Sequence, residues 1–235
     1  MEPNAFDMAI MHWLDQYVQV SASFNHIVKH ISLNNAFKGF PLMLAFWYLW
    51  FSDPQGEYQK RRILMVTLVG AFLAMALALA VNLSMPFKVR PYVNDELGLT
   101  PLLGLPEKSH TGLFFVSSFP SDTSALFFAI SIGLFYVSRR IGWLALLYTL
   151  VVIAMPRVYL RLHYPTDIIA GAAIGIASVA FCRWADEKLR YGDWMEVLLR
   201  RLPALSHALL FFVSYQIIDL FYTLRLIAGG LAKAL

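Results

Sequence analysis

The chain has 235 residues, of which 59% are hydrophobic and 14% charged, whereas an ordinary soluble domain is about 45–50% apolar and roughly 25% charged. The formal net charge is +4, but the basic residues are scattered between apolar runs, which favours loop charges that set membrane orientation over nucleic-acid binding. A single cysteine, Cys182, excludes an internal disulfide framework and a thiolate metal cluster.

The first 34 residues are predicted to form an amphipathic segment. Apolar residues recur at about helical spacing between Ile10 and Val18, and the acidic residues Asp7 and Asp15 make the stretch too polar for a cleavable signal peptide. We expect a helix that lies on the membrane surface. A helix packed on the bundle is a nearly equal alternative.

Residues 35–235 contain six segments that approach the length of a membrane span, about 20 mostly apolar residues. The predicted fold class is therefore all-α, a polytopic membrane helical bundle of about six transmembrane helices. The last segment contains Asp219 and Arg225, which either pair with each other or mark a dimer contact in a homo-oligomer. The six segments are 35–52, 63–85, 119–138, 141–158, 166–185 and 204–228.

The distribution of basic residues predicts the orientation. Ten of the 19 lysines and arginines fall in the connections 52–62, 139–140 and 183–203. Because cytoplasmic loops carry the excess of Lys and Arg, we expect both termini and the loops 86–118 and 157–165 to face outward. In a bacterial inner membrane this side is the periplasm or the exterior.

Polar residues gather in three outward stretches. They are MPFKVRPYV at 85–93, SSFPSDTSALFF at 117–128 and MPRVYLRLHYPTDIIAG at 155–171. Ser121 and Asp122 open a helix whose first N–H groups suit an anion, although simple capping also explains them. Arg90 and Arg157 carry planar forks that fit phosphate or carboxylate oxygens, and interfacial snorkelling is the alternative for each of them alone.

His163 and Asp167 form the most specific pair in the third stretch. Pro165 suits the first turn of a helix, which puts Asp167 close to the helix start and leaves His163 just before it. We expect Asp167 to accept the N–H of one imidazole nitrogen, so that the other nitrogen is free to act as nucleophile or base. Metal ligation would need more His or carboxylate partners than this face offers.

The segment RVYLRLHYPTDIIAG resembles the third signature of the type 2 phosphatidic acid phosphatase family, membrane relatives of vanadium haloperoxidases. FPSD resembles the second signature and RP at 90–91 the end of the first. The resemblance implies that His163 attacks phosphorus and is held by Asp167. It implies that Arg90, Arg157 and the N–H groups around Ser121 and Asp122 bind the phosphoryl oxygens of a membrane lipid phosphate, with no metal and no cofactor.

Four positions depart from the family pattern, and one of them is Pro156, which replaces the serine with which the third signature often opens. Thr123 stands where the second signature usually has a histidine that protonates the leaving oxygen, Leu83 stands where the first signature begins with lysine, and Arg161 replaces a residue that is commonly small. A threonine hydroxyl is a poor general acid, and loss of such a group commonly costs about 10²- to 10⁴-fold in rate. His110 is an alternative proton source.

These departures leave several functions open. The favoured substrate is a polyprenyl diphosphate, because a phosphate-monoester leaving group is already stable as an anion, and Arg161 or Lys88 would then hold the second phosphate. An undecaprenyl-diphosphate-phosphatase-like member is one form of this prediction. The alternatives are a phosphatidate or phosphatidylglycerophosphate phosphatase, a lipid-to-lipid phosphotransferase, and a degenerate member that binds phospholipid without hydrolysing it.

Overall fold

Helices form the regular structure of residues 2–52, 58–105 and 117–221, which are the residues that the computed structural model describes. No strand occurs among them. A π-helical segment and two short 3-10 helices accompany the α-helices. The elements are α1 (Ala5–Asp15), α2 (Ala22–Leu33), α3 (Asn35–Phe51), α4 (Tyr58–Ser84), η1 (Pro91–Val93), η2 (Asp95–Leu97), α5 (Asp122–Val137), α6 (Arg139–Tyr148), η4 (Thr149–Ala154), α7 (Met155–Tyr159), α8 (Pro165–Leu189), α9 (Tyr191–Arg201) and α10 (Pro203–Ile218).

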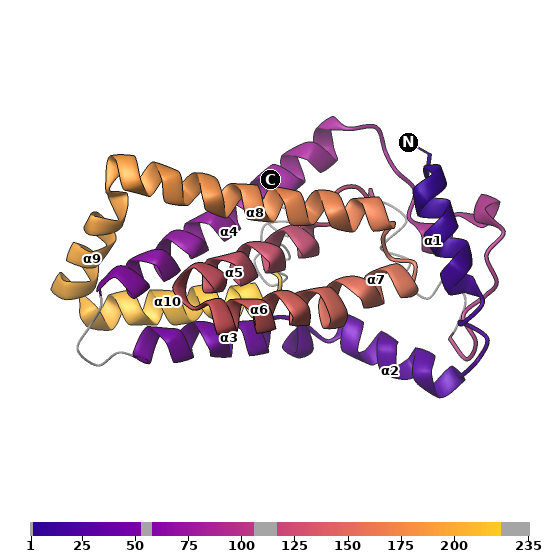
Figure 1. Cartoon of the computed structure of the whole chain (residues 1–235), viewed down its shortest axis with the longest axis horizontal. Helices are drawn as coiled ribbons and strands as arrows, with labels where there is room; N and C mark the ends of the chain where they lie inside the picture. The colour runs from indigo at the N-terminus through magenta and orange to yellow at the C-terminus, as the bar shows by residue number, and fades with distance from the viewer. Residues whose placement is uncertain (1, 53–57, 106–116, 222–235) are drawn as a thin grey trace, which may run out of the picture.

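The bundle helices run along one long axis, with short helices across its two ends (Figure 1). Helices α4, α5 and α8 form the centre, and each of them packs against the other two. Helices α1 and α2 lie at one end and α9 at the other, as Figure 1 shows. The three polar stretches predicted to meet therefore follow α4, precede α5 and precede α8 at the end that carries α1 and α2.

Among the described residues, three helices are long and apolar enough to cross a membrane, and up to four if the bent pair α9 and α10 counts as one span. The three are α4, the continuous helix Arg139–Tyr159 and α8. The chain is an integral membrane protein, but the predicted count of six spans is not confirmed. Helix α5 has only 16 residues, and the segment 204–228 lies partly outside the described residues.

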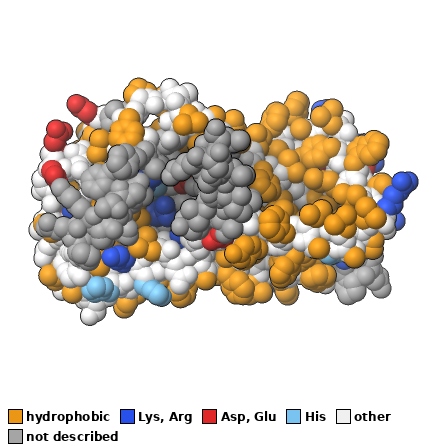
Figure 2. Space-filling view, turned by 180° about the vertical axis from the view of Figure 1, so that it is seen from behind, with side chains coloured by type: hydrophobic (Ala, Val, Ile, Leu, Met, Phe, Trp, Pro, Cys, Tyr) orange, Lys and Arg blue, Asp and Glu red, His pale blue; other side chains and the backbone are white. Residues whose placement is uncertain are grey.

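The surface seen from behind has the composition that a membrane protein requires. Hydrophobic side chains cover most of the half that carries the bundle, and basic side chains appear at its outer end (Figure 2). Large apolar residues on this bundle, such as Leu144, Phe181 and Phe211, are more than half exposed. Such a surface is stable when lipid instead of water covers it.

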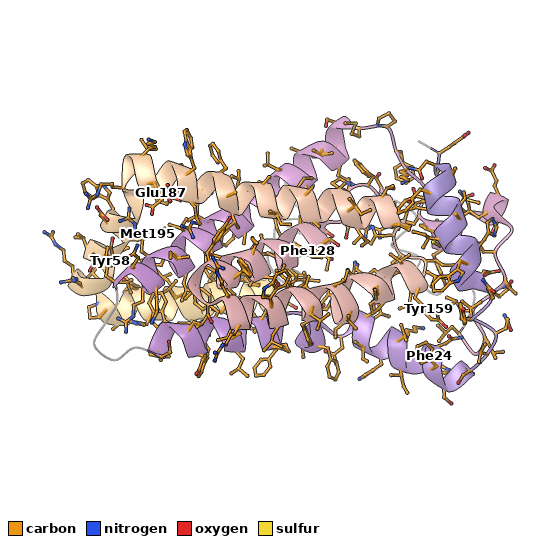
Figure 3. All side chains as sticks on the ribbon, in the orientation of Figure 1. Phe24, Tyr58, Phe128, Tyr159, Glu187 and Met195 are labelled. Atoms are coloured by element: carbon orange, nitrogen blue, oxygen red, sulfur yellow. The ribbon has the colours of Figure 1, made fainter. Side chains whose placement is uncertain are left out.

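The N-terminal segment forms two helices where one was predicted. Both helices bury polar residues on the side that faces the protein, Asp7 in α1 and Asn25 in α2. Phe24 of α2 packs edge-to-face on Tyr159 of α7, with ring centroids 5.6 Å apart (Figure 3). The two helices are therefore packed on the bundle, while their position at a membrane surface stays a prediction.

Two glycines of α8 allow this helix to lie close against α5. A Cβ atom at Gly171 would come within 2.3 Å of the Ser121 carbonyl oxygen, and one at Gly175 would come within 2.3 Å of the Ala125 carbonyl oxygen. Small residues at such positions let two helix backbones approach closely in a membrane bundle. The approach brings the first turn of α8, with Asp167, against the first turn of α5.

Candidate active site

Backbone hydrogen bonds tie the three polar stretches into one unit. The Ser118 N–H donates to the Lys88 carbonyl at 2.9 Å, and the Ser121 N–H donates to the Asp167 carbonyl at 3.1 Å. The Tyr92 N–H donates to the Arg161 carbonyl at 2.8 Å. These bonds, with the side-chain bond between Lys88 and Asp167, which are 79 residues apart in sequence, join the three stretches into one framework.

His163 lies at the centre of this unit and is 1% exposed. Its Nδ1 is 2.9 Å from the Ser118 carbonyl oxygen, and its Nε2 is 3.2 Å from Nη1 of Arg90. A carbonyl only accepts and a guanidinium only donates. Nδ1 therefore carries the proton, and Nε2 presents its lone pair toward the cationic side of the site.

The predicted hydrogen bond between His163 and Asp167 is replaced by a longer electrostatic contact. Asp167 Oδ2 is 3.8 Å from His163 Nδ1, beyond hydrogen-bond distance. That oxygen accepts instead from the Ser118 hydroxyl at 2.5 Å and from the Tyr164 N–H at 2.9 Å. The sequence pattern gave no reason to expect Ser118, whose carbonyl and hydroxyl serve both members of the pair.

Burial and neighbouring cations keep the imidazole neutral. Burial lowers the pKa of His163 to about 4, Arg90 and Arg157 act in the same direction, and Asp167 opposes them. A neutral imidazole with one protonated nitrogen is the form that a nucleophile requires. Burial also lowers the pKa of Arg90 from its ordinary value, against the influence of Asp122 and Asp167.

A buried chain of charges supports Asp167 from behind. Lys88 Nζ donates to Asp167 Oδ1 at 2.8 Å and to Asp7 Oδ2 at 3.2 Å. Asp7 also accepts from the N–H of Thr166 at 2.9 Å and from its hydroxyl at 2.7 Å. Lys88 and the two aspartates are at most 3% exposed, so α1 is part of the framework that holds the His163 loop.

Arg90 flanks the Nε2 side of His163, and Arg157 acts electrostatically on the same ring. Arg90 is 6% exposed, and its Nη1 also donates to the Leu162 carbonyl at 2.9 Å, which fixes the guanidinium. Arg157 has a fully buried Nε without a hydrogen-bond partner. Burying a hydrogen-bond donor without an acceptor lowers the stability of the folded protein. A ligand with oxygen acceptors would therefore stabilise this side chain.

The first turn of α5 completes the site. The Ser121 side chain accepts from the Ser124 N–H at 3.3 Å, as an N-cap does. Asp122 Oδ1 accepts from the Thr123 N–H at 2.7 Å and from its hydroxyl at 3.3 Å. Capping thus accounts for part of this motif, and Asp122 also acts electrostatically on Arg90 and Arg157.

Two predicted phosphate ligands lie elsewhere in the framework. Lys88 is held between Asp7 and Asp167, and Arg161, in the left-handed conformation with φ 60°, forms an ion pair with Asp15. Each cation faces a carboxylate in this structure, and its role as a ligand of a second phosphate stays a prediction. His110 and Arg225 lie outside the described residues, and Asp219 accepts from the Asn35 side chain.

A cavity of about 400 Å³ opens beside the site. One wall is the apolar face of α4, and the other contains the polar groups of the site. An apolar wall beside a cationic end suits an amphiphile. The lining includes Met75, Ala78, Leu79 and Asn82 of α4, together with Arg90, Ser117, Pro120 and Asp122.

Among the residues that the structure describes, no group of three or more His, Cys, Asp or Glu side chains could hold a metal ion. The charged residues closest to His163 are instead cations and one carboxylate. The arrangement that this geometry supports is a buried nucleophilic imidazole beside a cationic oxygen-binding site.

Comparison with known proteins agrees with this arrangement. A family model described as the PAP2 superfamily matches residues 36–191. The chain belongs to this superfamily. All three polar stretches fall inside the match, whereas Asp7 and the rest of α1 lie outside it.

Two curated relatives are similar to the chain. One is the bacitracin transport permease protein BcrC of Bacillus licheniformis, 39% identical over 75 residues, which are 32% of this chain and 36% of the relative's length. The other is the lipid A 1-diphosphate synthase of Escherichia coli strain K12, 27% identical over 200 residues, 80% of each chain. No solved structure matches the chain significantly.

Proposed function

We propose that the protein is a membrane lipid phosphatase that removes a phosphate from a polyprenyl diphosphate on the outward side of the membrane. The observation that carries this proposal is the tautomer of His163, whose Nε2 lone pair faces Arg90 while Nδ1 donates to Ser118. Membership of the PAP2 superfamily supports phosphatase chemistry. The cavity beside α4 supports a lipid substrate.

The first step is an in-line attack on the terminal phosphorus. The Nε2 lone pair forms the N–P bond, and the P–O bond to the lipid phosphate breaks with its electrons on the leaving oxygen. Arg90, Arg157 and the N–H groups at the start of α5 would stabilise the oxygens of the transferred group. Asp167, 3.8 Å from the ring, would offset the positive charge that the imidazole gains.

The second step is hydrolysis of the phosphohistidine. A water oxygen attacks phosphorus, the N–P bond breaks with its electrons returning to Nε2, and inorganic phosphate leaves with both protons of the water. The Nδ1–H bond to Ser118 is kept throughout, so the ring needs no reorientation between the steps.

A diphosphate substrate fits a site in which Thr123 stands where the family usually has a proton-donating histidine. Thr123 is 2% exposed and its hydroxyl donates to Asp122, so it is a weak acid that already has an acceptor. An alkoxide leaving group requires a proton, whereas a departing phosphate is stable as an anion. A phosphatidate or phosphatidylglycerophosphate substrate would be cleaved more slowly by this site.

The direct test uses purified protein in detergent with a polyprenyl diphosphate and with phosphatidate. We expect phosphate release from the diphosphate to be faster, to disappear in His163→Gln and to persist in a chelator. A preference for phosphatidate contradicts the leaving-group argument, and loss of activity with chelator contradicts a metal-independent reaction.

Phosphotransfer to a second lipid is the other candidate, because the similarity to the lipid A 1-diphosphate synthase extends over 80% of both chains. The same phosphohistidine would then meet a lipid phosphate oxygen in place of water. Radiolabelled diphosphate decides between them: labelled inorganic phosphate indicates hydrolysis, labelled acceptor lipid indicates transfer, and absence of label on His163 indicates a lipid-binding protein without catalysis.

A further inference from the structure

A second cavity lies along α4, the helix that also walls the cavity beside the site. Its volume is about 230 Å³, and its other walls come from α9, which contributes Met195 (Figure 3), and from α10. The lining residues of α4 fall between Met65 and Phe72 in this second cavity and between Met75 and Asn82 in the first. Because α4 runs from the end of the bundle that carries α9 to the end that carries α1 (Figure 1), the first cavity lies between the second one and the site.

The two cavities share one face of α4. Lining residues recur at steps of three or four along the helix, from Met65 through Val69, Phe72 and Leu79 to Asn82. This spacing places side chains one above the other on a helix. At a rise of about 1.5 Å per residue the face is roughly 25 Å long, close to the thickness of about 30 Å of the hydrocarbon core of a bilayer.

Phe72 marks the boundary between the two cavities. Its ring lies edge-on to that of Phe221, with ring centroids 5.2 Å apart, and the lining of the first cavity begins one turn further along α4. The end of α10 brings Phe221 to this position. The Phe221 N–H donates to the Gln216 carbonyl at 2.8 Å, and Leu220 takes the left-handed conformation with φ 54°, as in a Schellman turn.

The lining changes from polar to apolar along this face. Arg90 and Asp122 line the first cavity at the site end, where the Asn82 side chain donates to two backbone carbonyls of the stretch before α5. Among the described residues that line the second cavity, Ser206 is the one with a polar side chain, and its hydroxyl donates to the Leu198 carbonyl at 3.2 Å. A hydrocarbon in the second cavity would therefore leave this hydroxyl with its partner.

We propose that the two cavities together hold the hydrocarbon chain of the substrate, and that the second cavity gives the protein a preference for long polyprenyl chains. This inference rests on the proposed phosphatase function and adds the chain length to it. Phe72 lies roughly 15 Å from Asn82 along α4, a distance that a farnesyl chain covers. A hexaprenyl chain extends past Phe72 and reaches the walls that α9 and α10 form. Since lipid is as apolar as these walls, the long chain gains only packing contacts, and the preference is modest.

Filling the second cavity tests the assignment. The wild-type protein should have a kcat/KM for hexaprenyl diphosphate about 10-fold above that for farnesyl diphosphate. Val69→Trp on α4 and Leu209→Trp on α10 should each bring the ratio of the two values to about 1. Leu77→Trp, at an exposed position of α4 outside both linings, is the matched control and should keep the ratio. A wild-type ratio near 1, an unchanged ratio in the filled variants, or an equal change in Leu77→Trp would overturn the proposal.

Photo-crosslinking locates the chain without turnover. In the His163→Gln background, farnesyl diphosphate with a diazirine at its chain end should label α4 between Met75 and Asn82, and the hexaprenyl analogue should label α9 or α10. Mass spectrometry of the labelled peptides identifies the positions. Labelling of α9 and α10 by both analogues equally, or by neither, means that bulk lipid or detergent fills the second cavity, and it overturns the proposal. The expected labelling in a protein whose wild-type form releases no phosphate from either substrate overturns the phosphatase function instead.

Discussion

The carbonyl oxygen of Ser118 accepts the Nδ1–H of His163 at 2.9 Å. The same serine donates its hydroxyl to Asp167 at 2.5 Å. One residue, in the stretch before α5, therefore fixes the tautomer of the nucleophile and orients the carboxylate behind it. As a result, the lone pair of His163 Nε2 faces Arg90.

The neutral state of His163 predicts the acid side of the pH profile. Since burial lowers the pKa of His163 to about 4, kcat/KM should fall as pH drops through about 4, and no histidine-like loss should appear near pH 6.5. Between about pH 6.5 and pH 4, His163 takes up a proton in the unfolded chain but stays neutral in the folded protein. The free energy of unfolding should therefore decrease as pH falls from about 6.5 toward 4. A loss of kcat/KM centred near pH 6.5 would contradict a buried neutral imidazole.

Substitution of Asp7 should show that α1 belongs to the catalytic framework. Asp7→Asn leaves Lys88 and Thr166 with a weaker partner. We expect a loss of about 3 kcal/mol in the free energy of unfolding, typical of a broken buried ion pair, and about a 10-fold lower kcat because the His163 loop loses its support.

Asp15→Asn is the control for this substitution. Asp15 ties α1 to Arg161 and Thr100 but does not contact Lys88. Calorimetry measures the stability of the two variants, and phosphate release measures their kcat. Asp15→Asn should lower kcat less than Asp7→Asn does. Equal effects would mean that α1 acts only through overall stability.

Removal of Arg157 should separate stability from activity. Its Nε is buried without a partner, and the charge of Arg90 acts unfavourably on it. Arg157→Met should therefore raise the unfolding midpoint of the ligand-free protein while lowering kcat/KM by about 10²-fold or more, as expected for a lost electrostatic group. Arg140 is exposed, and Arg140→Met should change neither the unfolding midpoint nor kcat/KM. A lower midpoint for Arg157→Met would indicate a structural role instead.

Substitution of Thr123 by histidine should place a general acid at the start of α5. Thr123→His should raise the rate on phosphatidate about 10-fold or more, because an alkoxide leaving group would gain a general acid, and should leave the rate on a polyprenyl diphosphate nearly unchanged. Thr123→Asn offers similar bulk without an acidic proton. A gain in both variants would show that shape, and not proton donation, limits the reaction.

Local patterns in the sequence determined the helical class, the three polar stretches and the pair His163 and Asp167, because apolar run length and residue spacing are properties of neighbouring residues. The tertiary structure decided which groups contact that pair. Ser118 contacts both members of the pair, and Asp7 supports them through Lys88 and Thr166; both residues come from segments far from residue 163 in sequence, and their burial depends on how α1, α5 and α8 pack. Lys88 and Arg161 were predicted to bind phosphate from their charge alone, but the positions of Asp7, Asp167 and Asp15 give both cations a carboxylate partner. Charge is fixed by residue type, whereas the partner of a charge is fixed only by the fold.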